Sequence, residues 1–441
     1  MKKFFNNLVG AVLIALALHL LGWGLQAIVS IASPDFGASP VGRSIGNFFK
    51  VGAVIMFVFS LVYPYLKGKI KVKRAWIGQV LLVFGLVIWG MLSFQKSKID
   101  LLYLSLKKPS RGWYGQPHVA DDQLGYAPNP GAQAFHTFPD STFLPMRWSE
   151  EGFRIPVEAA LPGTEDDPLV LFLGCSFTYG DAVAAENTFS YLVADSLGYR
   201  YQNAGVCGWG LAQIYLRGKE LIQQYQPDYV VLQYSPWLVE RGVSNYAPSY
   251  SALIPSPYIY NVESGVQVAP PPFRALGYSL PVNDYKQTAE GFGDYLSFAY
   301  RVGWRLVLYE WVQKYRTSLR RKMGKLPPLN RNQNPATEQA VYQALVQEVK
   351  NVGGTPILLA LSNESVSEAS QQFAKQVNVA KVADGDHALW SSLSDSTKAS
   401  YSDTYHHWRM LEGTRTRVDQ HPNEHAHALI ANTIIEQIIS E

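Results

Sequence analysis

The chain has 441 residues, 47% of them hydrophobic and 13% aromatic, with 38 Lys and Arg against 35 Asp and Glu. This length fits one large domain with accessory segments, or two domains. Low charge and ample apolar content exclude disorder for most of the chain, and two cysteines are too few for a disulfide scaffold. Neither the Cys/His spacing of a structural zinc site nor a Walker-type glycine-rich loop occurs, so we expect no metal and no cofactor.

The positive charge is concentrated in the first quarter of the chain. Residues 1–110 carry 13 Lys and Arg and 2 Asp, a net charge of +11. The remaining 25 Lys and Arg against 33 acidic residues give a net charge of −8. A nucleic-acid-binding protein would place its excess positive charge on the folded domain. Here the charge accompanies the most apolar segment, which indicates membrane topology and no nucleic-acid partner.

Three long apolar runs precede residue 95 and predict a membrane anchor of three helices. The first covers residues 8–31 and the third residues 75–94. Each is long enough to cross the bilayer as a helix, which takes about 20 residues. The second, 51–66, reaches this length if 45–49 joins it with Lys50 at the interface. The later runs argue against a cleaved signal peptide, and buried core helices are the remaining alternative.

The charges of the short loops predict the orientation of the anchor. Loop 67–74 contains five Lys and Arg, and the positive-inside rule places it in the cytoplasm together with Lys2 and Lys3. Three spans then deliver everything after about residue 95 to the outer side. We expect a multi-pass protein of the bacterial inner membrane with a cytoplasmic N-terminus and a periplasmic large domain.

From residue 169 onward, short apolar strands alternate with helix-length segments. Repeated βα units of this kind predict an α/β fold, a three-layer α/β/α sandwich around a parallel sheet. The expected strands are 169–173, 199–202, 229–234, 356–361 and 377–382. The expected helices are 186–197, 211–226, 337–352 and 425–439.

The expected organisation has three parts: a membrane anchor at 1–95, a connector at 96–165 and the α/β domain at 166–441. A Pro- and Tyr-rich stretch interrupts the βα rhythm after the third strand. A long helical segment, about 294–323, follows it and is rich in Trp and Tyr with a basic end. We therefore expect residues about 240–333 to form an insertion.

A serine follows the first buried strand of this domain. Ligands of α/β sheets bind beyond the carboxyl ends of the strands. Ser176 lies there between Gly174 and Gly180, where a helix N-terminus could stabilise developing negative charge. An ordinary serine N-cap is the alternative.

An aspartate and a histidine lie immediately before the expected last helix. A histidine base needs a carboxylate to fix its tautomer, and Asp419 can provide this for His421 from the same loop. An Asp/Asn-rich helix cap that includes Asn423 is the alternative. His387 also follows aspartates, at 384 and 386, and we rank it lower because no terminal helix follows.

Together these features resemble the SGNH (GDSL-like) hydrolase superfamily over about residues 165–441. The first block of that family, Gly-Asp-Ser-x-Thr-x-Gly, matches 174–180 with Cys175 in place of Asp. The second block matches 203–208, and the last, Asp-x-(x)-His-Pro, matches 419–422. The resemblance implies a flavodoxin-like sheet and chemistry on ester bonds.

The resemblance also implies roles for individual residues. Ser176, His421 and Asp419 would form a Ser-His-Asp triad, and the N–H groups of Ser176 and Gly208 would form an oxyanion hole. The family's third block usually adds an Asn donor to this hole. Here 233–237 contains no Asn, so the Ser235 hydroxyl or the Trp237 indole N–H would have to substitute.

Two further predictions concern residues near the strand ends. The aromatic side chains of Tyr179, Trp209 and Trp237 could stack on sugar rings, with core packing as the alternative. Cys175 and Cys207 should lie at the ends of neighbouring strands. We expect two buried thiols, with a disulfide as the alternative in an oxidising compartment.

A membrane anchor joined to such a domain resembles glycan O-acetyltransferases and acetylesterases. We therefore expect a serine esterase or O-acyltransferase acting on acetyl or other acyl esters of a cell-surface polysaccharide. Three spans are too few to import acyl groups, so transfer would need a separate membrane acyltransferase. The alternatives are a catalytically silent scaffold, which the missing Asn favours, and a lipid esterase that uses segment 294–323 at the bilayer.

Overall fold

The structure is a computed structural model that describes residues 112–440, except 116, 141, 248–253, 275–303, 330–333 and 363–366. The three predicted membrane spans lie outside these residues. Within the described ranges, no helix combines the length and the apolar character that a membrane span requires.

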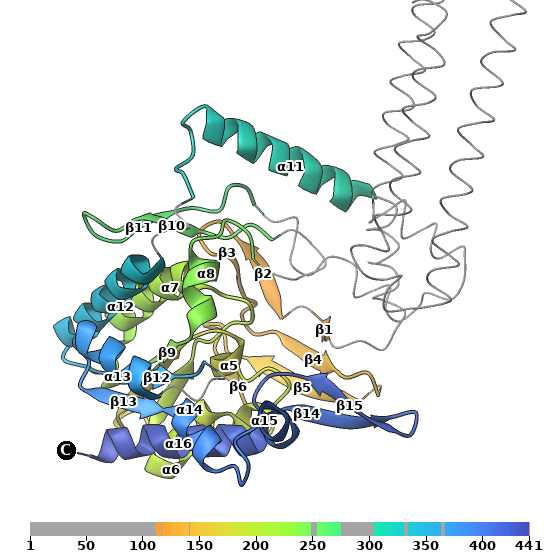
Figure 1. Ribbon diagram of the computed structural model, residues 1–441, viewed down its shortest axis with the longest axis vertical. Coiled ribbons are helices and arrows are strands. Elements are labelled where there is room, and N and C mark those ends of the chain that lie inside the picture. The colour runs from red at the N-terminus through yellow and green to blue at the C-terminus, as the bar shows by residue number, and fades with distance from the viewer. Residues whose placement is uncertain are drawn as a thin grey trace, which may run out of the picture. The chain divides into compact units, whose positions relative to one another are not determined.

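The centre of the described fold is a five-stranded parallel sheet (Figure 1). Its strands, in spatial order, are β13 (Lys381–Asp384), β12 (Thr355–Ala360), β9 (Tyr229–Tyr234), β7 (Leu169–Leu173) and β8 (Arg200–Asn203). Numbered along the chain this order is 2-1-3-4-5, the flavodoxin-like arrangement. All five residues of β7 are buried, as a continuous apolar run predicts for a central parallel strand.

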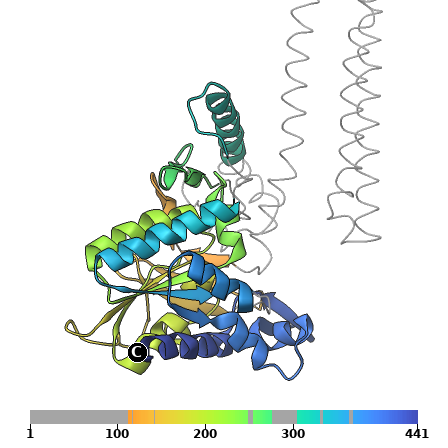
Figure 2. The ribbon, with the colours of Figure 1, turned by 60° about the vertical axis from the view of Figure 1, so that its left-hand side comes forward.

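Helices cover both faces of this sheet and complete the predicted three layers (Figures 1 and 2). One layer contains α7 (Leu211–Tyr225), α12 (Asn334–Asn351) and α13 (Ser367–Gln376). The other contains α6 (Phe189–Leu197), α14 (Gly385–Ser391) and α16 (Glu424–Ile439), and α16 packs against both α6 and β13. The last strand begins at Lys381, later than predicted. Val377 and Val379 lie in the turn that follows α13, and they pack in the hydrophobic core without being part of a strand.

The region expected to be a plain connector contains antiparallel strands. A four-stranded sheet has the order β1 (Gly112–Gly115), β4 (Gln133–Thr137), β5 (Phe143–Trp148) and β6 (Arg154–Ile155). A hairpin of β2 (His118–Asp121) and β3 (Gly125–Pro128) lies between β1 and β4 in the chain. Side chains of Ala134, Met146 and Trp148 share a buried cluster with Tyr179 and Cys207 of the α/β domain. We call β1, β4, β5 and β6 the N-terminal sheet.

A second hairpin, also absent from the predicted elements, precedes the last helix. After α15 (Lys398–Tyr405), β14 (His407–Leu411) pairs with β15 (Thr414–Asp419). The two residues between the strands, Glu412 and Gly413, have φ angles of 47° and 78°. Positive φ at both positions is typical of the tight turns that match the twist of a hairpin. The hairpin ends at Asp419, the first residue of the Asp-x-His-Pro block.

The segment between β9 and α12 contains the remaining described elements. They are α8 (Pro236–Gly242), the pair β10 (Tyr258–Asn261) and β11 (Gln267–Ala269), and α11 (Trp304–Lys322). Tyr258 donates a hydrogen bond to the Pro327 carbonyl, and Arg320 at the end of α11 donates to the Pro272 carbonyl. These elements lie between β9 and α12, where the sequence analysis expects the insertion at about 240–333. The insertion and the domain boundaries stay predictions.

Candidate active site

Ser176 is presented directly after the central strand β7. The chain turns through Gly174, where an added Cβ would lie 2.0 Å from the Thr178 Oγ1 atom, so only glycine fits. The single-turn helix α5 (Ser176–Tyr179) begins at Ser176 itself. Cys175 occupies the N-cap position and makes no side-chain cap bond. The alternative of a serine N-cap therefore does not describe Ser176.

The structure brings the three predicted triad residues together. The Nε2 atom of His421 lies 2.7 Å from the Ser176 Oγ atom. The Nδ1 atom of His421 lies 2.7 Å from the Asp419 Oδ1 atom, which also accepts the His421 backbone N–H at 2.8 Å. Asp419 is 2% exposed, and Ser176 6%. One carboxylate therefore fixes both the ring and the backbone of the histidine that contacts the serine.

A second carboxylate, which the sequence analysis did not single out, lies beside this base. The Asp181 Oδ2 atom is 3.7 Å from the His421 Nδ1 atom, and Asp181 is buried. The backbone around Asp181 is held by Arg154 of β6, which is 2% exposed. The Arg154 guanidinium donates to three backbone carbonyl groups, those of Tyr179, Gly180 and Val183.

A buried histidine of the N-terminal sheet lies between the two carboxylates. His136 of β4 places its Nδ1 atom 3.1 Å from the Asp181 Oδ1 atom. Its Nε2 atom lies 4.0 Å from the Asp419 Oδ2 atom. Asp181 could have been noticed because it follows the first sequence block directly. His136 belongs to no motif, and nothing in the sequence pattern marked it.

Three of these side chains are close enough to raise the question of a metal ion. Ligand atoms of Asp181, Asp419 and His421 lie within 4.8 Å of one another. However, the 2.7 Å separation between His421 Nδ1 and Asp419 Oδ1 is a hydrogen-bond distance. An ion would have to replace the proton between these two atoms, so we interpret the group as a hydrogen-bonded cluster.

The structure rejects one of the two proposed substitutes for the missing oxyanion donor. Ser235 is fully buried, accepts a hydrogen bond from Gln233 at 2.8 Å and donates its proton to the Leu361 carbonyl. Ser235 is therefore not available, and that prediction is wrong. The Trp237 indole N–H lies 3.5 Å from the Cys175 Sγ atom, next to Ser176. Its role in the oxyanion hole stays a prediction.

Gly208 has the backbone geometry of a specialised position. Its φ angle is 78°, which favours glycine. The carbonyl of Cys207 accepts a 2.7 Å hydrogen bond from the Tyr126 hydroxyl of β3. Because a peptide unit is planar, this bond also fixes the direction of the Gly208 N–H. The donation of that N–H to an oxyanion stays a prediction.

Two of the predicted sugar-stacking residues are buried. Tyr179 and Trp209 are each 1% exposed. The Tyr179 ring stacks with Trp148, and the Trp209 indole N–H donates to the Tyr126 carbonyl at 3.2 Å. The stacking prediction is wrong for these two residues, because the N-terminal sheet and β3 cover them. Trp237 is half-buried and packs against Phe177, whose ring also contacts His421.

The remaining sequence alternatives are also resolved by the structure. Cys175 and Cys207 are both buried and are not joined by a disulfide. His387 is exposed, and its backbone N–H donates to Asp384 at 2.9 Å, which caps α14. This junction joins the edge strand β13 to α14, and α14 is not the terminal helix.

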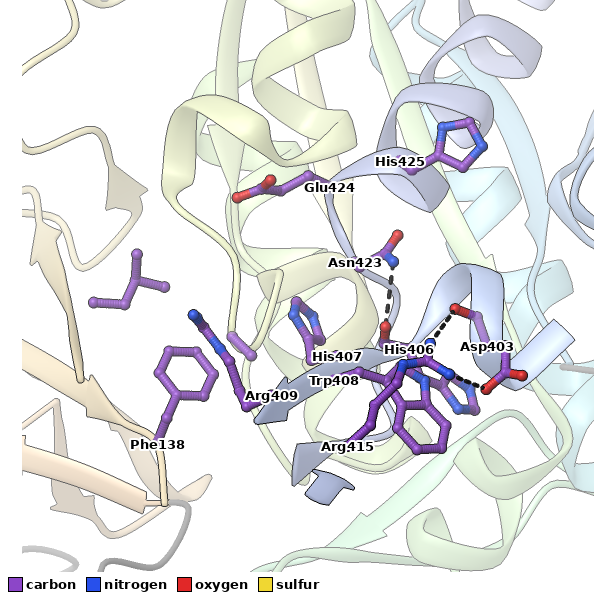
Figure 3. A pocket seen from close by; sticks show the side chains of 12 residues that line it. Phe138, Asp403, His406, His407, Trp408, Arg409, Arg415, Asn423, Glu424 and His425 are labelled. Atoms are coloured by element: carbon purple, nitrogen blue, oxygen red, sulfur yellow. Dashed lines mark hydrogen bonds and ion pairs between the residues drawn. The ribbon is translucent and has the colours of Figure 1, made fainter. Parts of the chain in front are cut away.

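A cavity of about 550 Å³ adjoins the loop that carries His421 (Figure 3). Figure 3 shows the Arg409 side chain directed between Phe138 and His407, and its guanidinium lies 4.7 Å from the Phe138 ring centroid. Burial lowers the pKa of His407 and lowers that of His406 to about 4. Both of these histidines are therefore neutral at neutral pH.

Comparison with known proteins gives matches among solved structures alone. No protein-family model matches the sequence, and no curated protein matches it significantly. TesA has 12% identity and a TM-score of 0.31, with 62% of this chain and 98% of TesA covered. A variant of Axe2, an acetylxylan esterase from Geobacillus stearothermophilus, has 14% identity and a TM-score of 0.29, with 64% and 98% covered.

A third similar structure comes from Desulfitobacterium hafniense. It has 14% identity and a TM-score of 0.29, with 61% of this chain and 99% of that chain covered. At these values the similarities are weak, so the site is interpreted below from its own geometry. The Desulfitobacterium protein is described as a lipolytic protein of the G-D-S-L family.

Proposed function

We propose that this protein is an SGNH-type serine esterase or O-acyltransferase that acts on acyl esters. The observation that carries the proposal is the continuous contact from Ser176 through His421 to Asp419, with 2.7 Å at each step. A serine hydroxyl is a weak nucleophile by itself and becomes active when an adjacent base takes its proton. A carboxylate behind that base fixes its tautomer and stabilises the imidazolium.

The proposed roles of these three residues give a reaction sequence. Ser176 Oγ attacks the acyl carbonyl carbon while His421 Nε2 takes the hydroxyl proton. The ester bond then breaks, His421 returns the proton to the departing alcohol oxygen, and an acyl-serine remains. Water or a sugar hydroxyl attacks the acyl-serine in the same way and releases the serine. The two outcomes are hydrolysis and acyl transfer.

The substrate that we propose is an acetyl or other acyl ester of a cell-surface polysaccharide outside the cytoplasm. The support comes from the three apolar runs before residue 95 and the positive charge of loop 67–74. Transfer would require a separate membrane acyltransferase as acyl donor. A reporter that is active only in the periplasm, fused after residue 441, should be active; a silent reporter would mean that the orientation is inverted.

Two observations keep alternative functions in consideration. The commitment of the Ser235 hydroxyl to Leu361 removes one oxyanion donor, and losing a donor typically costs about 100- to 1,000-fold in rate. This favours a catalytically silent scaffold. The helix α11 exposes Val312, Tyr315 and Leu319 and has a basic last turn, which favours a lipid esterase at a membrane surface.

Acetate release separates these functions. Full-length protein should release acetate from p-nitrophenyl acetate and from an acetylated polysaccharide, faster than it releases fatty acid from phospholipid vesicles. Ser176→Ala should abolish release while its thermal unfolding midpoint stays close to that of the wild type. Preference for the vesicles would support the lipid esterase. Unchanged acetate release by Ser176→Ala would rule out the proposed nucleophile.

A further inference from the structure

Four ionisable side chains meet behind the nucleophile, those of His421, Asp181, Asp419 and His136, and the last three are closed to solvent. Asp181 and Asp419 are 3% and 2% exposed, and His136 is 1% exposed. Burying two neighbouring carboxylates is costly unless a positive charge or hydrogen-bond donors compensate them. His136 lies between them, 3.1 Å from an Asp181 oxygen and 4.0 Å from an Asp419 oxygen.

The position of the His136 ring favours its charged form. The two ring nitrogen atoms lie at ion-pair distance from different carboxylates, Nδ1 from Asp181 and Nε2 from Asp419, although neither nitrogen makes a hydrogen bond within the described residues. A positive charge at this point is attracted by both carboxylates, whereas a neutral ring would compensate neither of them.

We propose that His136 is a charged positioning residue that, together with Asp181, holds the base His421 and adjusts its proton affinity. The positive His136 offsets part of the negative charge of the two carboxylates. The Nδ1 atom of His421 lies 2.7 Å from Asp419 and 3.7 Å from Asp181. Because His136 offsets part of their negative charge, the two carboxylates do not hold the His421 ring permanently protonated. The consequence for catalysis rests on the function proposed above, but the effect on His421 does not.

The other charged and titratable groups around this cluster support the assignment. His118 of β2 is neutral, because burial lowers its pKa to about 3. His407 of β14 is also neutral at neutral pH, because burial lowers its pKa. Arg154 of β6 is committed to backbone carbonyls on both sides of Asp181. Among the groups that face the two carboxylates in the described residues, His136 is therefore positioned to supply the compensating charge.

The test is a titration of His421 in full-length protein in detergent micelles, followed by nitrogen-15 shifts of labelled histidine rings. The His421 signals are assigned by their loss in His421→Ala. His136→Gln removes a positive charge and should raise the His421 midpoint by about one pH unit or more. Asp181→Asn removes a negative charge and should lower it by a similar amount.

His427→Gln provides a matched control. His427 is also fully buried, and burial lowers its pKa to about 3, so its replacement by neutral Gln changes no charge near neutral pH. The His421 midpoint should stay unchanged in this variant. An unchanged midpoint in His136→Gln and in Asp181→Asn would overturn the proposal and leave a purely structural role. If His136→Gln fails to fold, the shift in Asp181→Asn decides.

The same variants separate this proposal from the proposed function. The acidic limb of the pH–rate profile for p-nitrophenyl acetate should move in the direction of the His421 midpoint. Shifted midpoints in a protein that releases no acetate would refute the esterase function and leave the role of His136 standing. Acetate release together with unchanged His421 midpoints in the variants would refute the role of His136 and leave the esterase function standing.

Discussion

Two histidines in this chain follow aspartates, yet they have different surroundings. His421 contacts Ser176 through one ring nitrogen and Asp419 through the other. His387 is exposed in the first turn of α14, and the nearby Asp384 caps the helix. The difference arises because His421 sits on a loop that folds back on Asp419, whereas the backbone of His387 is already helical.

Kinetics of three variants should reproduce this difference. His421→Ala should lower the rate of p-nitrophenyl acetate hydrolysis by about 10,000-fold or more, because a triad member is lost. Asp419→Asn should also be severe, since the amide favours the wrong tautomer of His421. His387→Ala is the control and should stay within a few-fold of the wild type. A large loss in the control together with a mild loss in His421→Ala would contradict the assignment.

At the scale of single residues, the sequence predicted those that belong to motifs and missed those that reach the site only when the chain folds. Ser176, Asp419 and His421 carry recognisable neighbours in the chain. His136 lies in a short strand without a motif and reaches Asp181 only when the N-terminal sheet packs on the α/β domain. The burial of Tyr179 and Trp209 depends on the same packing, which an aromatic residue near a strand end does not reveal.

At the scale of elements, α16 and α6 meet through a buried histidine. His427 of α16 accepts a 3.1 Å hydrogen bond from the Phe189 backbone N–H at the start of α6. Burial lowers the pKa of His427 to about 3, well below its usual 6.5. A protonated ring could no longer accept that N–H. The contact between the two helices therefore requires neutral His427.

Acidification should weaken this contact. In the unfolded chain His427 protonates below its usual value of 6.5, whereas in the folded protein it stays neutral down to about 3. The contribution of neutral His427 to the free energy of unfolding is therefore fully present above pH 6.5. It is lost as the pH falls toward 3, by an amount on the order of a few kcal/mol. Denaturant unfolding at pH 7 and pH 4.5 measures the loss, and His427→Gln should reduce it. A loss of the same size in this variant would exclude His427 as its source.

The elements that were predicted and missed differ in a physical way. Strands β7, β9 and β12 are almost entirely buried and appear in the sequence as continuous apolar runs. The hairpin strands β14 and β15 are mostly exposed or half-buried and show no apolar alternation. The hairpin is stabilised by its turn geometry and its contacts, which hydrophobic patterning does not detect.

For the described part of the molecule, the order of the parallel strands explains where the site forms. Strand β7 is an interior strand between β8 and β9, and its carboxyl end carries Ser176. The last loop brings His421 to this point from a different layer. The N-terminal sheet adds His136 and Arg154 from a region that seemed to be only a connector. The site is thus built by three separate stretches of the chain.

The measurement that tests the triad most directly is labelling with a fluorophosphonate probe, followed by mass spectrometry of the modified peptide. Such a probe forms a bond with a serine only where a base activates its hydroxyl. We expect the adduct on Ser176 in the full-length protein, strongly reduced labelling in His421→Ala and none in Ser176→Ala. The exposed Ser264 offers a control, and Ser264→Ala should label like the wild type. An adduct on another serine, or equal labelling of Ser176→Ala, would contradict the account.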